Sequence, residues 1–191
     1  MMANLPGSRR PMIRVLRQET LYTGRVIQLV REVLDMGGRR VTREVIQHPG
    51  AVVIVPLRSP SQILFVRQYR RAVDRELLEL PAGTLERGER RVDCARRELL
   101  EETGWRARRM RRLGQFYAAP GVLSEQLTVF VAQGLTYVGA APEADEAIRP
   151  VTLSLRTALA KIRSGALCDA KSIIGVLFAA RLLRDRRLFA S

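Results

Sequence analysis

The hydrophobic pattern of the first fifty residues predicts β-structure. β-Branched and long side chains dominate residues 13–20 and 25–34, which is typical of strands. A Gly-Gly pair at 37–38 gives a turn signal, and residues 41–48 after it alternate between two faces. This part of the chain therefore predicts antiparallel strands that include a hairpin.

Continuous apolar runs replace this alternation in the middle of the chain. Residues 51–57 are almost entirely apolar, as is typical of a strand that is buried on both faces, and residues 63–69 predict the next strand. Two further strands are expected over residues 110–117 and 126–132, on either side of a Pro-Gly pair at 120–121.

The last forty residues predict helices. A short strand is expected over residues 151–155, followed by helices over 155–163 and 171–184. The second of these helices carries an apolar stripe made of Ile174, Leu177, Phe178 and Leu182. Strands interleaved with a few helices indicate an α/β fold.

A third helix is predicted before Gly104, which stands where a C-terminal cap glycine would end it. Val92, Ala95 and Leu99 recur at offsets of three and four, and they form a narrow stripe that can pack on a core. The pattern therefore predicts that one edge of this helix is buried and that the neighbouring edge faces a cleft.

Glu98, Glu101 and Glu102 lie on one face of this predicted helix, beside the apolar stripe. Like charges at this spacing destabilise a helix by roughly 0.2–0.5 kcal/mol per pair, so a bound cation would explain why they are there. Oxygen ligands favour a hard divalent ion, Mg²⁺ or Mn²⁺. The alternative is a solvated helix surface with Arg–Glu pairs.

The chain has 191 residues, which suits one domain, and a net charge of +14. Almost all of the positive charge is arginine, because Lys161 and Lys171 are the only lysines. The charge could attract a polyanion, or it could reflect a compositional preference for arginine. We favour composition, because the arginines are spread along the chain.

The remaining composition points to a cytoplasmic protein. No run of eighteen apolar residues predicts a membrane-spanning helix, and the N-terminus lacks the apolar core of a signal peptide. Cys94 and Cys168 lack metal-binding spacing, and we expect both to be free, buried thiols.

Residues 83–105 combine these features in one spaced pattern. It reads Gly83, five residues, Glu89, seven residues, Arg97-Glu98-Leu99, one residue, Glu101-Glu102, one residue and Gly104-Trp105. This pattern resembles the signature sequence of the Nudix hydrolases, which cleave nucleoside diphosphates linked to another group.

The resemblance implies an α/β/α sandwich with a mixed sheet. It would occupy residues 49–191, after a disordered segment over 1–10 and a strand region over 11–48. In the branch that this chain resembles, such N-terminal strands commonly form a homodimer, so residues 11–48 are a candidate dimerisation region.

The resemblance also assigns roles within the pattern. Glu98 and Glu102 would be the principal ligands of Mg²⁺, or of Mn²⁺ in its place, with Glu101 as a further ligand and the Ala82 carbonyl completing the site. Arg97 would orient the glutamates by charge-assisted hydrogen bonds, and Glu89 would support the loop or act as an outer ligand.

Flanking segments resemble the ADP-ribose pyrophosphatase branch of the family. They are residues 66–70, 76–83, 119–125 and 165–171. The resemblance implies hydrolysis of ADP-ribose to AMP and ribose 5-phosphate. It also implies that the substrate contacts Arg67, Arg70, Glu79, Pro120 and Gly121.

Some of these assignments have simpler alternatives. Arg67 and Arg70 point to opposite faces of a strand, so one of them could be solvated, and the Pro120-Gly121 pair could be only a turn. The general base in this branch often lies on an acidic loop, where Glu146 is our first candidate and Glu143 the reserve.

Two rival functions stay open. The first is hydrolysis of another nucleotide sugar such as GDP-mannose. The second is a non-catalytic Nudix-fold module that holds RNA or DNA by its charge. We do not expect nucleic acid to be a partner, because a nucleic-acid-binding module has no need of the clustered carboxylates that this chain carries.

Overall fold

The computed structural model describes residues 13–139 and 148–184. The chain divides into two compact units. The first contains Met1–His48 and Ala119–Ser124, and the second contains Pro49–Ala118 and Glu125–Ser191. Each unit is described by itself.

The first unit is a three-stranded antiparallel sheet in the order β1-β2-β3. The strands are β1 (Ile13–Thr23), β2 (Gln28–Met36) and β3 (Arg40–Gln47). Gly37 and Gly38 have φ angles of 69° and 88°, which side chains disfavour, so the pair makes the turn of the predicted hairpin. Val30 is the only buried residue among the described part of this unit.

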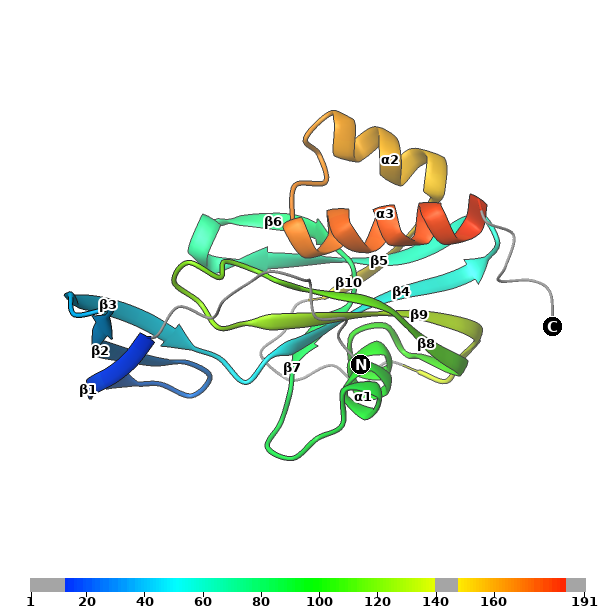
Figure 1. Ribbon diagram of the computed structural model, residues 1–191. Helices are drawn as coiled ribbons and strands as arrows, with labels where there is room; N and C mark the ends of the chain where they lie inside the picture. Colours follow the sequence, from blue (N-terminus) through cyan, green and yellow to red (C-terminus); the bar gives the residue numbers. More distant parts are fainter. Residues whose placement is uncertain (1–12, 140–147, 185–191) are drawn as a thin grey trace. The chain divides into compact units, whose positions relative to one another are not determined.

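The second unit is built on a mixed sheet whose strand order is β10-β5-β4-β9-β8 (Figure 1). Its long strands are β4 (Ala51–Ser59), β5 (Gln62–Arg70), β8 (Trp105–Tyr117) and β9 (Gln126–Tyr137). The short ones are β6 (Arg75–Glu79), β7 (Ala82–Thr84) and β10 (Arg149–Ser154), and a 3₁₀ turn, η1 (Arg71–Val73), follows β5. The pair β4–β9 is parallel and the others are antiparallel.

Helices cover both faces of this sheet, as Figure 1 shows. On one face, α2 (Leu155–Arg163) and α3 (Ala170–Arg184) enclose the larger hydrophobic cluster, which includes Val53, Phe65 and Leu80. On the other face, α1 (Arg91–Thr103) packs Ala95 and Leu99 into a second cluster. Strand β4 alternates between the two clusters, which explains its continuous apolar run. The predicted α/β/α sandwich is therefore confirmed.

Most predicted elements are confirmed, with differences at the ends. Strand β8 begins at Trp105 rather than at residue 110, because an edge strand exposes arginines that obscure the alternating pattern. Of the two cysteines expected to be buried, Cys94 is buried. The prediction is wrong for Cys168, which is exposed in the turn before α3.

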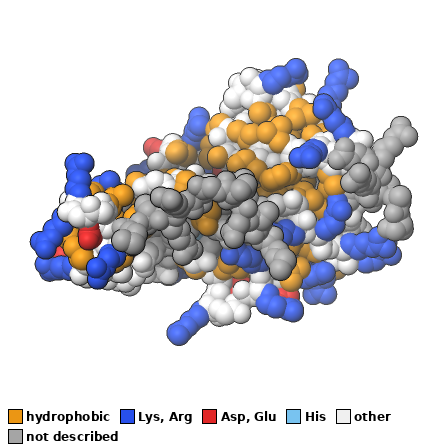
Figure 2. Space-filling view, in the orientation of Figure 1, with side chains coloured by type: hydrophobic (Ala, Val, Ile, Leu, Met, Phe, Trp, Pro, Cys, Tyr) orange, Lys and Arg blue, Asp and Glu red, His pale blue; other side chains and the backbone are white. Residues whose placement is uncertain are grey.

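Basic side chains are distributed over the visible surface rather than gathered in one place (Figure 2). This distribution agrees with the compositional interpretation of the +14 charge. None of the helices among residues 13–139 and 148–184 has the length and apolar character needed to cross a membrane.

Candidate active site

Helix α1 supplies the acidic wall of a small polar cavity in the second unit. Its buried stripe fixes its rotation, and Gly104, with φ 75°, ends it in the left-handed conformation predicted for a cap. The adjacent face then presents Glu98, Glu101 and Glu102 to a cavity of about 180 Å³. The other lining residues are Gln68, Arg70, Ala82, Gly83, Thr84 and Arg97.

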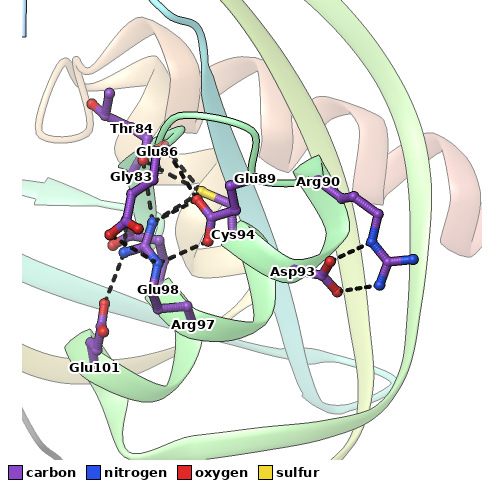
Figure 3. A network of polar contacts seen from close by, with 10 residues as sticks. All are labelled: Gly83, Thr84, Glu86, Glu89, Arg90, Asp93, Cys94, Arg97, Glu98 and Glu101. Carbon is purple, nitrogen blue, oxygen red and sulfur yellow. Dashed lines mark hydrogen bonds and ion pairs between the residues drawn. The ribbon is translucent and has the colours of Figure 1, made fainter.

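Arg97 lies among the carboxylates and donates hydrogen bonds to three of them (Figure 3). It also forms a longer ion pair with Glu86 at 3.9 Å. Its Nε and Nη2 each donate to one oxygen of Glu89 at 3.0 Å. Its Nη1 donates to Glu98 at 2.7 Å and to Glu101 at 3.1 Å, and Nη2 also contacts the Thr84 carbonyl at 3.3 Å. One guanidinium therefore links the loop before α1 to two glutamates of the cavity.

This network shifts the pKa values of Arg97 and Glu89. The hydrogen bonds to Glu89 raise the pKa of Arg97. Burial opposes this shift, and the negative charge of Glu98 adds to it. The same hydrogen bonds, opposed by partial burial, hold the pKa of Glu89 below its ordinary value. Glu89 and Arg97 therefore remain ionised near neutral pH.

The backbone of strand β7 lies close to Glu98 and Glu102 of α1. Glu102 is only 6% exposed, and its Oε2 accepts the Ala82 N–H at 3.2 Å. At Gly83, a methyl group in place of the hydrogen would overlap the Glu98 carboxylate. The absence of a side chain at Gly83 thus leaves the space that the Glu98 carboxylate occupies.

The donor chemistry of this cavity fits a hard divalent cation. It offers three carboxylates and the β7 backbone, and oxygen donors are what Mg²⁺ and Mn²⁺ prefer. Across residues 13–139 and 148–184, however, no three His, Cys, Asp or Glu side chains are already gathered as a metal-binding group. Instead, Glu98 and Glu101 are turned toward Arg97.

A larger cavity of about 380 Å³ adjoins the small one. Arg70, Ala82, Gly83 and Thr84 line both cavities. The rest of its wall combines apolar, aromatic and charged residues, which are Ala51, Phe116, Tyr117, Ala118, Glu125, Leu127, Asp169, Ala170, Lys171 and Ile174. A ligand that carries an acidic group can therefore place that group against Arg70, which lines both cavities, and its organic part in the larger space.

Comparison with known proteins decides the family. The NUDIX domain matches residues 47–164, which is more than half of the chain. The chain belongs to the Nudix family. It is a Nudix hydrolase, and most of the residues that line the small polar cavity belong to its Nudix signature sequence at 83–105.

Relatives support the assignment along most of the chain. An ADP-ribose pyrophosphatase of Bacillus subtilis is 33% identical over 86% of this chain and 91% of its own. An ADP-ribose pyrophosphatase of Mycobacterium tuberculosis is 39% identical over 85% and 80%. A GDP-mannose pyrophosphatase of Cronobacter sakazakii is 31% identical over 81% and 80%.

A solved structure shows the same fold. The crystal structure of an ADP compounds hydrolase superposes with a TM-score of 0.81, covering 92% of this Nudix chain and 96% of the other. The two sequences are 22% identical, so this likeness concerns the fold alone.

The structure separates the predicted substrate residues of the Nudix site. Arg70 lines both cavities, whereas Arg67 points to the other face and pairs with Glu76 at 3.2 Å. Glu79 is 1% exposed and lies behind the wall, where it binds Arg70. Its position allows it to orient Arg70 rather than to line either cavity.

The other predicted residues are not among the described residues that line the two cavities of the second unit. Pro120 and Gly121 belong to the first unit, in a turn closed by a 3.0 Å bond from the Val122 N–H to the Ala119 carbonyl. Glu143 and Glu146 fall outside the described residues.

Several cavity residues were not predicted. They come from the ends of distant elements, as with Phe116 and Tyr117 on β8 and Asp169 and Lys171 at the start of α3. Asp169 and Lys171 fall within the segment 165–171 that resembles the ADP-ribose pyrophosphatase branch, but no role was predicted for either of them. Lys171 is also one of only two lysines in the sequence.

Proposed function

We propose that this Nudix hydrolase cleaves the diphosphate bridge of ADP-ribose and releases AMP and ribose 5-phosphate. The observation that carries the proposal is the shared wall of the two cavities, made by Arg70 and Ala82–Thr84. A diphosphate beside Glu98, Glu101 and Glu102 leaves an adjoining space for a nucleoside or sugar. The two relatives named ADP-ribose pyrophosphatase support this choice of substrate.

The proposed cofactor is Mg²⁺, with Mn²⁺ as a substitute. Glu98, Glu102, Glu101 and the Ala82 carbonyl would hold it. When bound, the cation would neutralise charge on the diphosphate and raise the acidity of water in the site. Arg97 would keep Glu98 and Glu101 ionised and oriented, and would stay bound to Glu89 when they turn toward the cation.

The remaining roles in the proposal belong to residues around the diphosphate. Arg70 would bind phosphate oxygens, because it faces both cavities and its guanidinium is fixed by two bonds to Glu79. Glu146, or Glu143 in its place, would accept the proton of the attacking water.

The test of the cofactor assignment is the variant Glu102→Gln. We expect Mg²⁺-dependent AMP release from ADP-ribose to fall by at least about a hundredfold, because an amide is a poor ligand for a hard cation. Glu44→Gln is the control, since Glu44 lies on an exposed strand of the first unit and pairs with Arg31. Activity of Glu102→Gln within threefold of the parent would contradict the assignment.

The general base has a separate test. We expect Glu146→Gln to lower kcat by about a hundredfold or more and to leave Mg²⁺ binding intact, as befits a proton acceptor. Glu143→Gln, measured in parallel by AMP release, should stay close to the parent. The reverse result would move the role to Glu143.

GDP-mannose is a second candidate substrate, because the Cronobacter relative is named for it. Product analysis with ADP-ribose and GDP-mannose, each with and without Mg²⁺, distinguishes the two. A kcat/KM for GDP-mannose above that for ADP-ribose would replace our first choice.

We also propose a homodimer formed through the first unit. Its strands expose large apolar side chains, namely Ile13, Val15, Leu16, Leu21 and Tyr22. A three-stranded sheet in which Val30 alone is buried, among the residues described, gains stability by covering such a surface with a second copy. Light scattering that gives the monomer mass at micromolar concentration would contradict this.

A further inference from the structure

Two cations on the wall of the larger cavity contact one oxygen of the same carboxylate. Arg70 donates Nε to Glu79 Oε1 at 2.9 Å and Nη2 to Oε2 at 2.7 Å. Lys171 Nζ donates to the same Oε2. Because both nitrogens contact one oxygen atom, the positive charges of Arg70 and Lys171 lie close together.

The cations, and not the carboxylate between them, face the cavity. The Glu79 side chain is 1% exposed, whereas that of Arg70 is 38% exposed and that of Lys171 is 16% exposed. Arg70 and Lys171 both line the larger cavity, and Glu79 is absent from the lining residues. Glu79 therefore holds the two cations from behind.

The second anion of this cluster, Asp169, is shared with helix α3. Its Oδ2 lies 2.9 Å from Lys171 Nζ and also accepts the Ser172 N–H at 3.0 Å, as a helix-capping residue does. Ser172 Oγ in turn accepts the Leu80 N–H at 2.7 Å. These contacts fix the first turn of α3, and with it Lys171, against the end of β6.

Counting donors shows what the pair can still bind. A guanidinium has five N–H donors and an ammonium has three. Contacts among the described residues use two donors of each group. Three donors of Arg70 and one of Lys171 therefore remain for a ligand in the cavity, and a phosphate offers several acceptor oxygens to receive them.

We propose that Lys171 is a second phosphate-binding residue of this site and acts with Arg70 on one phosphate group of the substrate. The inference rests on the proposed function, because it takes the ligand to be the diphosphate of the proposed substrate. Lysine suits the position because its ammonium is a compact charge that one carboxylate oxygen can hold, whereas an arginine there would present a planar fork.

The test uses inorganic pyrophosphate, which is common to all nucleoside diphosphate substrates, with the full chain in EDTA to remove metal. Calorimetry should show that Lys171→Met binds pyrophosphate about tenfold more weakly than the parent, as expected for loss of one charge-assisted hydrogen bond. Lys161→Met is the matched control, because Lys161 is the other lysine and lies on α2, outside both cavity linings. It should bind like the parent.

A second variant separates a binding role from structural damage. Asp169→Asn removes the competing negative charge and keeps an oxygen to cap α3, so it should bind pyrophosphate several-fold more tightly. Damage to the fold would not improve affinity, so this variant carries the test even if Lys171→Met does not fold. The unfolding midpoint of each variant is measured alongside.

The outcomes distinguish this inference from the proposed function. If the parent hydrolyses ADP-ribose but does not bind pyrophosphate in EDTA, or if affinity is unchanged in both Lys171→Met and Asp169→Asn, the inference is wrong and the function stands. If pyrophosphate affinity shifts as described but ADP-ribose is not hydrolysed, the phosphate site stands and the proposed substrate is wrong.

Discussion

At the residue scale, the site depends on Gly83, which has no side chain, and on the guanidinium of Arg97. Gly83 provides the volume that the Glu98 carboxylate occupies, and the positive charge of Arg97 reduces the repulsion among Glu89, Glu98 and Glu101. The burial of Cys94, with the charges of Glu89 and Glu98, raises the pKa of its thiol to about 12. Cys94 therefore stays protonated and acts as a packing residue.

Gly83→Ala should separate activity from stability. The added methyl would displace the Glu98 carboxylate, which is the flexible end of its side chain, so the backbone can stay in place. We expect AMP release to fall by at least about tenfold, since ligands must be held within about 0.5 Å of a productive position. The unfolding midpoint should stay within a few degrees of the parent. A variant with parental activity would show that the position of Glu98 is not important.

At the scale of the element, α1 combines a buried stripe with an acidic face. Ala95 and Leu99 are fully buried and set the rotation of the helix, so the glutamates need no contact of their own to face the cavity. The Gly104 N–H donates to the Leu100 carbonyl at 2.8 Å, which closes the last turn, the one that contains Glu101 and Glu102. The position of both glutamates therefore depends on this cap.

Gly104→Ala tests the cap. Alanine in the left-handed conformation should lower the free energy of unfolding by about 1 kcal/mol, measured by urea denaturation. Gly104→Asn is the matched variant and should lose less, because asparagine tolerates this conformation better. Equal stability of the parent and Gly104→Ala would contradict the role of the glycine.

At the scale of the whole molecule, an ion network joins separate elements of the second unit. Glu79 at the end of β6 binds Arg70 of β5 and Lys171 of α3. Burial acts to raise the pKa of Glu79, but Arg70 and Lys171 together hold it below its ordinary value. The ionised carboxylate is thus bound to two elements that are far apart in the sequence.

This network predicts a pH dependence of stability. Because the pKa of Glu79 is lowered in the folded state, its contribution is present above the ordinary carboxyl value of 4.5 and is lost as the pH falls through the folded value. The difference in free energy of unfolding between the parent and Glu79→Gln should therefore shrink as the pH falls below about 4.5. A difference that stays constant from pH 7 to pH 3 would contradict this role.

The sequence alone determined the elements and the acidic face of the site. A continuous apolar run predicted β4, because that strand is buried on both faces. Helical periodicity predicted α1, α2 and α3, because each is long enough for its buried side to leave a regular pattern. It also placed Glu98, Glu101 and Glu102 on one side of a helix, since local geometry fixes which residues share a face.

Only the tertiary structure decided what surrounds those glutamates. The larger cavity brings together Arg70, Phe116 and Lys171, which are separated by 46 and 55 positions in the numbering and share no local pattern. Strand pairing and helix packing create such neighbours, and neither has a signal in a single sequence. For the same reason, the sequence could propose Arg67 and Arg70 together, and the fold decided that Arg70 faces the cavities.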